Sequence, residues 1–175
     1  MAATGTLKLG PANGALLVRT GRTGAVARAG HDLLIEVAGW EATLELAGEA
    51  TTLTLRADST TLRVLEGTGG MMELGDDDKA SIVQTIDAEV LRTHDIEFRS
   101  SDVHVDGDRY EISGELTLAG LTRPLSFELE TGPGASLNAS ATVKQTDWGI
   151  KPYATLFGAL KVADEVTVTF DGEAV

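Results

Sequence analysis

Residues 110–127 read YEISGELTLAGLTRPLSF. Apolar side chains recur at every second position over much of this stretch, which is the spacing of strands with one face in a hydrophobic core. The same alternation returns in residues 137–143 and 166–170. The sequence offers only one convincing helix to cover these strands, so their sheet must largely cover itself. We therefore predict an all-β fold, a single antiparallel up-and-down β-barrel of about eight strands with one short α-helix.

Short turns between the predicted strands favour the up-and-down connectivity. Residues 106–108 read Asp-Gly-Asp and predict a tight hairpin, because Asp-Gly accepts the positive φ angles that such a turn needs. Gly120 to Pro124 predicts the next connection. Pro, Asn and Gly in residues 10–14 predict another turn, so that residues 7–9 and 16–18 are expected to form the first strand pair.

The predicted helix covers Lys79 to Leu91, where apolar residues recur at three- and four-residue spacing. Asp76, Asp77 and Asp78 place negative charge and hydrogen-bond acceptors at its N-terminus. We expect its apolar face to lie on the barrel. Before it, residues 67–75 contain four glycines and predict a loop, whose composition suits a gate.

Composition limits the classes of partner. The 175 residues contain no Pro/Ser-rich linker or charge block, which predicts one domain over residues 1–175. A net charge of -13 argues against nucleic acid and against docking on anionic membranes. Without cysteine the chain has no disulfide and no thiolate metal site. No apolar run is long enough for a leader or a membrane span, so we expect a cytoplasmic protein without stable membrane insertion, unless a leader has been removed.

Two His-Asp dipeptides, His31-Asp32 and His94-Asp95, are candidates for acid/base chemistry or metal binding. Neighbouring side chains in a strand point to opposite faces, so neither dipeptide can present both groups to one ligand. The two histidines can still meet in space, as catalytic groups or as polar groups at a barrel mouth. No G-x-S-x-G, H-E-x-x-H or G-x-G-x-x-G motif occurs. An enzyme with His31 or His94 as acid/base is therefore the second hypothesis, and no cofactor or metal is expected.

The interior of the barrel has two possible states. Aromatic residues make up only 5% of the chain, and aliphatic strand residues leave more unfilled volume than Phe and Trp do. A roomy aliphatic cavity suits a long hydrocarbon ligand. The alternative is a tightly packed dry core with the aromatic side chains as end plugs, and the periodicity favours neither.

The chain resembles the YceI-like family in six segments that follow the order of that family. They are Gly30–Leu33, Leu62–Gly67, Lys79–Leu91, Ile96–Ser100, Gly114–Leu125 and Asp147–Lys151. Phe-x-Ser before a hairpin and Gly-x-Leu-Thr-Leu-x-Gly-x-Thr-x-Pro are the most specific of these motifs. The resemblance implies an extended lipocalin-like barrel of eight strands. Its apolar lumen would hold a polyisoprenoid, an isoprenoid quinone or a fatty-acid-like amphiphile.

The resemblance also implies ligand-binding residues and a function. Those expected near the ligand are His31, Asp32, His94, Phe98, Trp148, Tyr153 and Phe157. Lys79, Lys151 or Arg99 would then be available for an anionic head group. The first hypothesis is non-catalytic binding, sequestration or transport of a lipid. The third hypothesis, after this binding protein and the enzyme considered above, is a ligand-free, stress-related interaction protein with a filled lumen. A homodimer is compatible with a small barrel.

Overall fold

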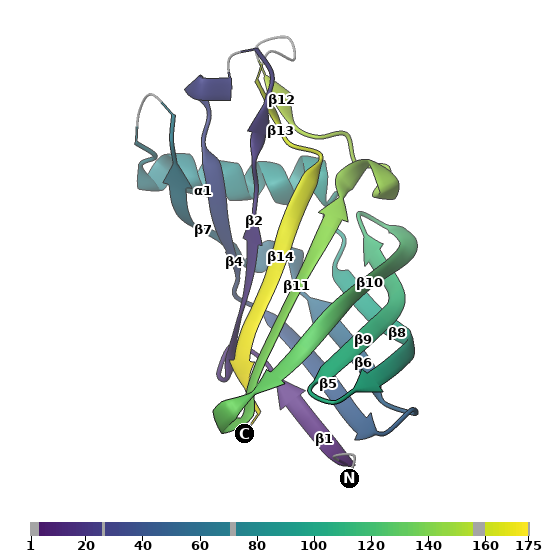
Figure 1. The fold of residues 1–175 in the computed structure, drawn as a ribbon. Coiled ribbons are helices and arrows are strands. Elements are labelled where there is room, and N and C mark those ends of the chain that lie inside the picture. Colours follow the sequence, from purple (N-terminus) through teal and green to yellow (C-terminus); the bar gives the residue numbers. More distant parts are fainter. Residues whose placement is uncertain (1–3, 26, 71–72, 156–159, 175) are drawn as a thin grey trace.

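The structure is a computed structural model that describes residues 4–25, 27–70, 73–155 and 160–174. Within them eleven strands form one curved antiparallel sheet, in the order β1-β5-β6-β8-β9-β10-β11-β14-β2-β4-β7 (Figure 1). These strands are β1 (Thr4–Leu9), β2 (Gly14–Arg19), β4 (Asp32–Val37), β5 (Trp40–Ala47), β6 (Thr52–Ala57), β7 (Leu62–Thr68), β8 (Ile96–Asp106), β9 (Arg109–Leu118), β10 (Leu121–Gly132), β11 (Ser136–Lys144) and β14 (Glu165–Glu173). The all-β fold class is confirmed.

Smaller elements lie at the ends of the sheet. A second sheet has the order β12-β13-β3. Its strands are β3 (Arg22–Thr23), β12 (Ala154–Thr155) and β13 (Leu160–Val162). The helix α1 (Asp76–Thr85) continues into a π-helix (Ile86–Val90), and short 3-10 helices cover Ala27–Ala29, Ser59–Thr61, Pro133–Ala135 and Gln145–Trp148.

Two bent strand segments reconcile the eleven strands with the expected eight. Only Ala38 and Gly39 separate β4 from β5, and one short 3-10 turn separates β6 from β7. The two bends stay hydrogen-bonded, since the Ala38 N–H donates to the Thr61 carbonyl at 3.1 Å and the Asp58 N–H to the Gly39 carbonyl at 2.9 Å. Counted as β4/β5 and β6/β7, they form an eight-stranded meander with β2, β8, β9, β10, β11 and β14. The pairing of β14 with β2 joins the last strand to the first, and β1 is additional.

The expected first strand pair was wrong. β1 pairs with β5, with Leu7 opposite Leu44, whereas β2 pairs with β14 and β4. The turn between β1 and β2 is tied to the far end of the chain, because Asn13 Nδ2 donates to the Glu173 carbonyl at 3.2 Å. β1 and β2 thus do not pair with each other. β2 lies along the β4 part of the bent β4/β5 segment, and β1 lies along its β5 part.

The predicted hairpin at residues 106–108 is confirmed, with Gly107 at a φ of 63° and Val105 opposite Tyr110. The next connection is shorter than Gly120 to Pro124. Ala119 and Gly120 alone make it, both with positive φ, as two-residue hairpin turns require. Pro124 already lies in β10.

The helix begins at Asp76, three residues before the predicted start. Gly75 is the N-cap, and its N–H donates to Asp78 Oδ2 at 3.0 Å, so the first turn extends through the acidic residues. α1 crosses one end of the barrel, opposite the two termini (Figure 1). Its residues Ile82 and Val83, with Ile86 and Val90 of the π-helix, pack against the core, as expected.

Candidate ligand-binding site

A cavity of about 670 Å³ lies inside the barrel at the α1 end. Its walls are the alternate, inward-facing residues of the strands, such as Leu16 and Val18 of β2 and Val166, Val168 and Phe170 of β14. Most of the remaining lining is also aliphatic. This is the space that the scarcity of aromatic residues made possible, and its volume is in the range of small-molecule sites.

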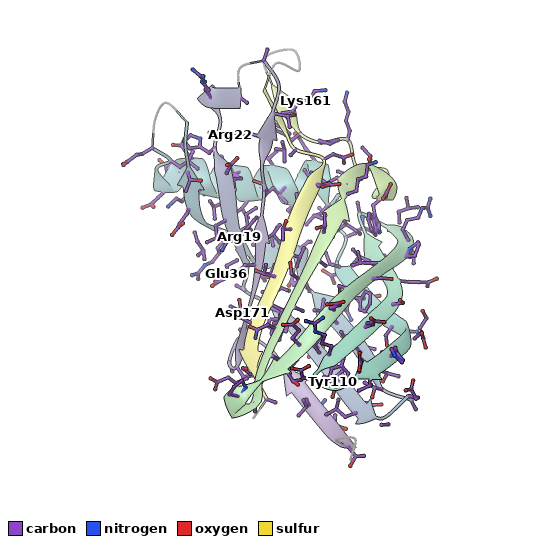
Figure 2. The ribbon with its side chains drawn as sticks, in the orientation of Figure 1. Arg19, Arg22, Glu36, Tyr110, Lys161 and Asp171 are labelled. Atoms are coloured by element: carbon purple, nitrogen blue, oxygen red, sulfur yellow. The ribbon has the colours of Figure 1, made fainter. Side chains whose placement is uncertain are left out.

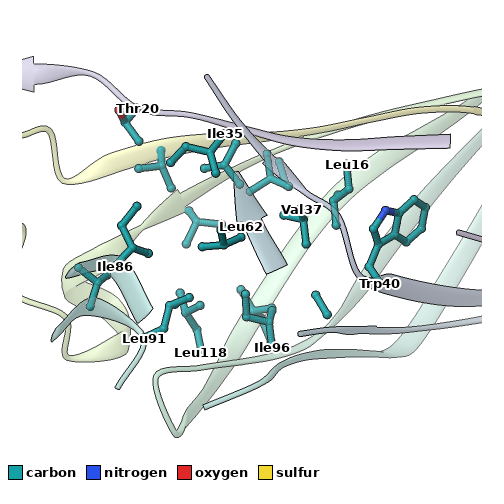
Figure 3. A pocket seen from close by; sticks show the side chains of 18 of the residues that line it. Leu16, Thr20, Ile35, Val37, Trp40, Leu62, Ile86, Leu91, Ile96 and Leu118 are labelled. Carbon is teal, nitrogen blue, oxygen red and sulfur yellow. The ribbon is translucent and has the colours of Figure 1, made fainter. Parts of the chain in front are cut away.

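Two aromatic residues line the part of the cavity farther from α1. Trp40 at the start of β5 meets Phe170 of β14 edge to face, with ring centroids 5.5 Å apart and planes at 79°. Figure 3 shows Trp40 and Leu16 at the opposite end of the cavity from Thr20 and Ile86. The lining continues past Trp40 to Ala42 and Leu53. We call the end near Thr20, Ser81 and Thr85 the mouth of the cavity.

Other core side chains are tightly packed and do not face the cavity. Leu44, Val103 and Ile112 are each 1% exposed, and Tyr110 and Leu137 are buried beside them in the same core cluster. None of these five residues lines the cavity. Figure 2 shows Tyr110 toward the end of the barrel opposite α1. The two interiors that the sequence left open therefore coexist, since the barrel contains both a cavity and packed core side chains.

One face of the helix forms part of the mouth. Asp78, Ser81, Ile82, Thr85 and Ile86 all line the cavity. Their spacing of three and four residues puts them on one side of a helix. The same spacing predicted the apolar face from the sequence, and the Asp, Ser and Thr of this face follow it as well.

The charges around the cavity are distributed unevenly. Every Lys, Arg and His of the sequence lies in the described ranges, yet none of these side chains lines the cavity, and Asp78 is the only charged residue that does. Arg22 lies at the α1 end with Lys161 (Figure 2). Its guanidinium is already engaged, since Nη1 donates to the Gly30 carbonyl and Nε lies 3.4 Å from Asp32 Oδ1.

Two of the expected ligand-binding residues line the cavity, Phe98 and Tyr153. Phe98 is buried against Phe127, with ring centroids 5.3 Å apart. Tyr153 is 46% exposed, at the edge of the lining. Trp148 does not line the cavity. It is buried, and its Nε1 donates to the Leu116 carbonyl at 2.8 Å, so it joins the Gln145–Trp148 turn to β9.

The three expected head-group cations lie outside the cavity lining. Arg99 and Lys151 are exposed, and Lys79 is half-buried. For Arg99 the reason is strand alternation, because its neighbour Phe98 faces inward. Lys79 follows the cavity-lining Asp78 on the helix, and the next residue around an α-helix points about 100° away.

The two histidines belong to different parts of the molecule. His31 lies over Gly67 and Gly70, close to β7, and its neighbour Asp32 is paired with Arg22. His94 is exposed and lies over Gly120, in the turn between β9 and β10. Neither histidine lines the cavity. Phe157 lies outside the described residues.

Neither a metal site nor a membrane-spanning helix is found in the described ranges. No three His, Cys, Asp or Glu side chains gather there as a metal site would require. No helix in those ranges has the length and apolar character needed to cross a membrane.

The model of the YceI-like domain matches residues 36–174. The chain belongs to the YceI-like family. Among curated proteins it is similar to a UPF0312 protein of Pseudomonas paraeruginosa, with 36% identity over 63 residues. That match covers 31% of this YceI-like chain and 33% of the Pseudomonas protein. The resemblance noted in the sequence is thereby confirmed.

Solved structures share the YceI-like fold at low identity. BcnA of Burkholderia cenocepacia has a TM-score of 0.66 and 15% identity, over 93% of this chain and 96% of BcnA. A polyisoprenoid binding domain of Saccharophagus degradans has a TM-score of 0.59 and 12% identity, over 99% and 100% of the two chains. The YceI protein of Campylobacter jejuni has a TM-score of 0.59 and 12% identity, over 80% and 82%.

Proposed function

We propose that this YceI-like chain binds one long apolar molecule, a polyisoprenoid or a similar single-chain lipid, and holds it without reacting with it. The observation that carries the proposal is the 670 Å³ aliphatic cavity. If each methylene takes roughly the 30 Å³ of a liquid water molecule, the cavity has room for about twenty of them. The polyisoprenoid-binding neighbour supports the ligand class.

The driving force is removal of the chain from water. Each buried methylene contributes about 0.8 kcal/mol, from which the cost of association is subtracted. Inside the cavity the methylenes would contact aliphatic side chains such as Val18, Ile35 and Val168. These side chains can select a hydrocarbon chain by its length and width. They offer no hydrogen bonds, so the polar end of the ligand must find its partners elsewhere.

The polar end would lie at the mouth and be uncharged. Hydroxyl groups of Thr20, Ser81 and Thr85 lie there. Thr85 Oγ1 already donates to the Ser81 carbonyl and can still accept, whereas Thr20 Oγ1 accepts from the Leu33 N–H and can still donate to an alcohol, amide or quinone. An anion drawn into the cavity would lose its hydration without a cationic side chain in the lining, and would face the Asp78 carboxylate. The expected binding of an anionic head by Lys79, Lys151 or Arg99 therefore receives no support from the geometry.

The alternative functions fit the cavity less well. An acid/base mechanism in the lumen needs a histidine there, and neither His31 nor His94 lines it. A ligand-free interaction protein was expected to have a filled lumen, whereas the lumen contains the 670 Å³ cavity. A cytoplasmic location and a homodimer stay predictions from the sequence.

The test is to identify what the purified protein carries. Native mass spectrometry and analysis of a solvent extract should show a neutral long-chain lipid at one per protein. Delipidated protein should then take up farnesol and discriminate against farnesyl diphosphate, which has the same chain with an anionic head. Failure to retain or take up any lipid would reject the proposal, whereas preference for the diphosphate would reject only the uncharged head.

A further inference from the structure

We infer that the side-chain amide of Gln145 accepts a hydrogen bond from a hydroxyl group of the ligand, so that the cavity selects alcohols over molecules of similar size without a hydroxyl. The inference rests on the proposed function, because it concerns the polar end of the molecule held in the same cavity. Three properties of Gln145 support it: its burial in the cavity wall, the orientation of its amide and its position at the mouth.

Gln145 is a buried polar residue in the wall of an apolar cavity. Three polar side chains of the described ranges are buried, those of Thr51, Ser59 and Gln145. Of these three, Gln145 alone lines the cavity, and it is only 7% exposed. A buried amide without hydrogen bonds costs free energy, so its polar atoms need partners in the protein or in a ligand.

One half of the amide has a partner in the protein and the other half has none. Nε2 donates to the Ala163 carbonyl at 3.0 Å. A carbonyl oxygen accepts but cannot donate, so the amide nitrogen must face Ala163 and Oε1 must point away from it. Within the described residues no group donates to Oε1, and this oxygen is not closed off from water. Since Gln145 lines the cavity, Oε1 offers the cavity an unused acceptor.

The backbone around Gln145 holds this amide in place. The Gln145 N–H donates to the Asp164 carbonyl at 2.9 Å, and the Gln145 carbonyl accepts from the Ile150 N–H at 3.2 Å. The next residue adds two bonds, since the N–H and the hydroxyl of Thr146 donate to the Asp164 carboxylate at 2.8 and 2.6 Å. Little conformational freedom is left to lose on binding, so a hydrogen bond to Oε1 keeps most of its contribution to affinity.

Gln145 lies at the end of the cavity where the polar end of the ligand is expected. It follows the last residue of β11, and β11 runs toward the end of the barrel that α1 crosses (Figure 1). Ala163, which accepts from Gln145, donates in turn to the Gly21 carbonyl at 2.9 Å. Gly21 follows Thr20, one of the residues of the mouth. Gln145 is therefore on the same side of the mouth as Thr20.

An acceptor in this place distinguishes polar ends by whether they carry a donor. A ligand hydroxyl would satisfy Oε1, whereas the oxygen of an ether, ester or quinone would displace water from Oε1 and leave it unpaired. Sites that hydrogen-bond a ligand hydroxyl discriminate for this reason against the analogue that lacks it. Among neutral lipids, the cavity should thus prefer a long-chain alcohol.

The experiment compares farnesol with farnesyl methyl ether, which has the same chain and no hydroxyl. Each ligand displaces the uncharged fluorescent probe N-phenyl-1-naphthylamine from delipidated protein. The unaltered protein should bind farnesol at least about fivefold more tightly than the ether, because the ether leaves a buried acceptor unpaired. Gln145→Met keeps the length of the side chain without its acceptor, and should bring the two affinities to within about twofold of each other.

Two further variants isolate the role of Oε1. Gln84→Met is the matched control, since Gln84 is exposed on α1 and does not line the cavity. Its preference for farnesol should equal that of the unaltered protein. Gln145→Glu keeps an acceptor oxygen of the same reach and should also keep the preference, so it decides if Gln145→Met does not fold.

The outcomes separate the two proposals. If the unaltered protein binds neither farnesol nor the ether, the proposed function fails. If it binds both equally, the binding function stands and the role of Gln145 is overturned. A preference that survives in Gln145→Met would also overturn it, as would loss of the preference in Gln145→Glu or in Gln84→Met.

Discussion

The Ser59 hydroxyl donates a hydrogen bond of 2.8 Å to Asp87 Oδ1. Ser59 lies in the bend between β6 and β7 and is 1% exposed, while Asp87 lies in the π-helix that follows α1. The bond joins the barrel wall to the helix that lies across the mouth. The helix is therefore fixed at its C-terminal end by a polar contact, while its apolar side chains cover the cavity.

Ser59→Ala should lower the free energy of unfolding by about 1–3 kcal/mol, because a part-buried carboxylate loses its hydrogen-bond donor. Urea denaturation measures the change. Ser101→Ala is the control, since this serine is exposed and should change stability by less than about 0.5 kcal/mol. Equal losses in the two variants would show that the Ser59–Asp87 bond contributes nothing specific.

Ala141→Phe should abolish lipid uptake without destabilising the fold. Ala141 lines the middle of the cavity opposite Val168 in the sheet, and a phenyl ring there would occupy space that a ligand needs. Thr142→Phe adds the same ring at the next, exposed position on the outer face and should leave uptake unchanged. Uptake of farnesol is measured by mass spectrometry, and retained uptake in Ala141→Phe would place the ligand outside the cavity.

Trp148→Phe should cost about 1–3 kcal/mol of stability, since the indole is buried and its hydrogen bond to the Leu116 carbonyl is lost. Thermal unfolding reports the change. Lipid uptake should stay within twofold of the unaltered protein, because Trp148 does not line the cavity. A selective loss of uptake at unchanged stability would instead assign Trp148 to the ligand, as the family resemblance implied.

Acid should destabilise the protein by protonating two aspartates, Asp58 and Asp164, that accept hydrogen bonds in the folded state. The Thr60 hydroxyl and N–H donate to Asp58 and hold its pKa below the ordinary value of 3.8, and Thr146 does the same for Asp164. Since the folded-state pKa values are lowered, this stabilisation is present above pH 3.8 and is lost as the pH falls through the folded-state values.

The measurement is the thermal midpoint of unfolding as the pH is lowered through and below 3.8. A double variant, Asp58→Asn with Asp164→Asn, should lose less of its midpoint over this interval than the unaltered protein. Identical pH profiles would show that these hydrogen bonds do not contribute to acid sensitivity.

Local sequence patterns predicted much of this fold, but they did not predict which strands distant in sequence pair with each other. Alternation correctly placed Leu116 and Leu118 inward, and the helical spacing of Ile82 and Ile86 identified the face that covers the cavity. The partner of β1 was missed because it depends on contacts such as that between Asn13 and Glu173, 160 residues apart in sequence. No local pattern records such a contact.

The sequence predicted an apolar site inside the barrel, but it did not predict the positions of several residues of that site. The outward direction of Arg99 follows from the inward Phe98 by strand alternation, so the sequence contained that information. The contact between Trp40 and Phe170 did not follow from local pattern, because it depends on β2 bringing β14 close to the β4/β5 segment. Whether the interior is hollow depends on the summed volumes of all inward side chains, which periodicity does not measure.

The packed residues Leu44, Val103 and Ile112 are buried and lie outside the cavity lining. Exchange of a guest in the cavity therefore need not expose them to water, and they can hold the strands in register during that exchange. Substitutions that change the preferred guest should be tolerated among the lining residues far more readily than comparable changes at these three positions.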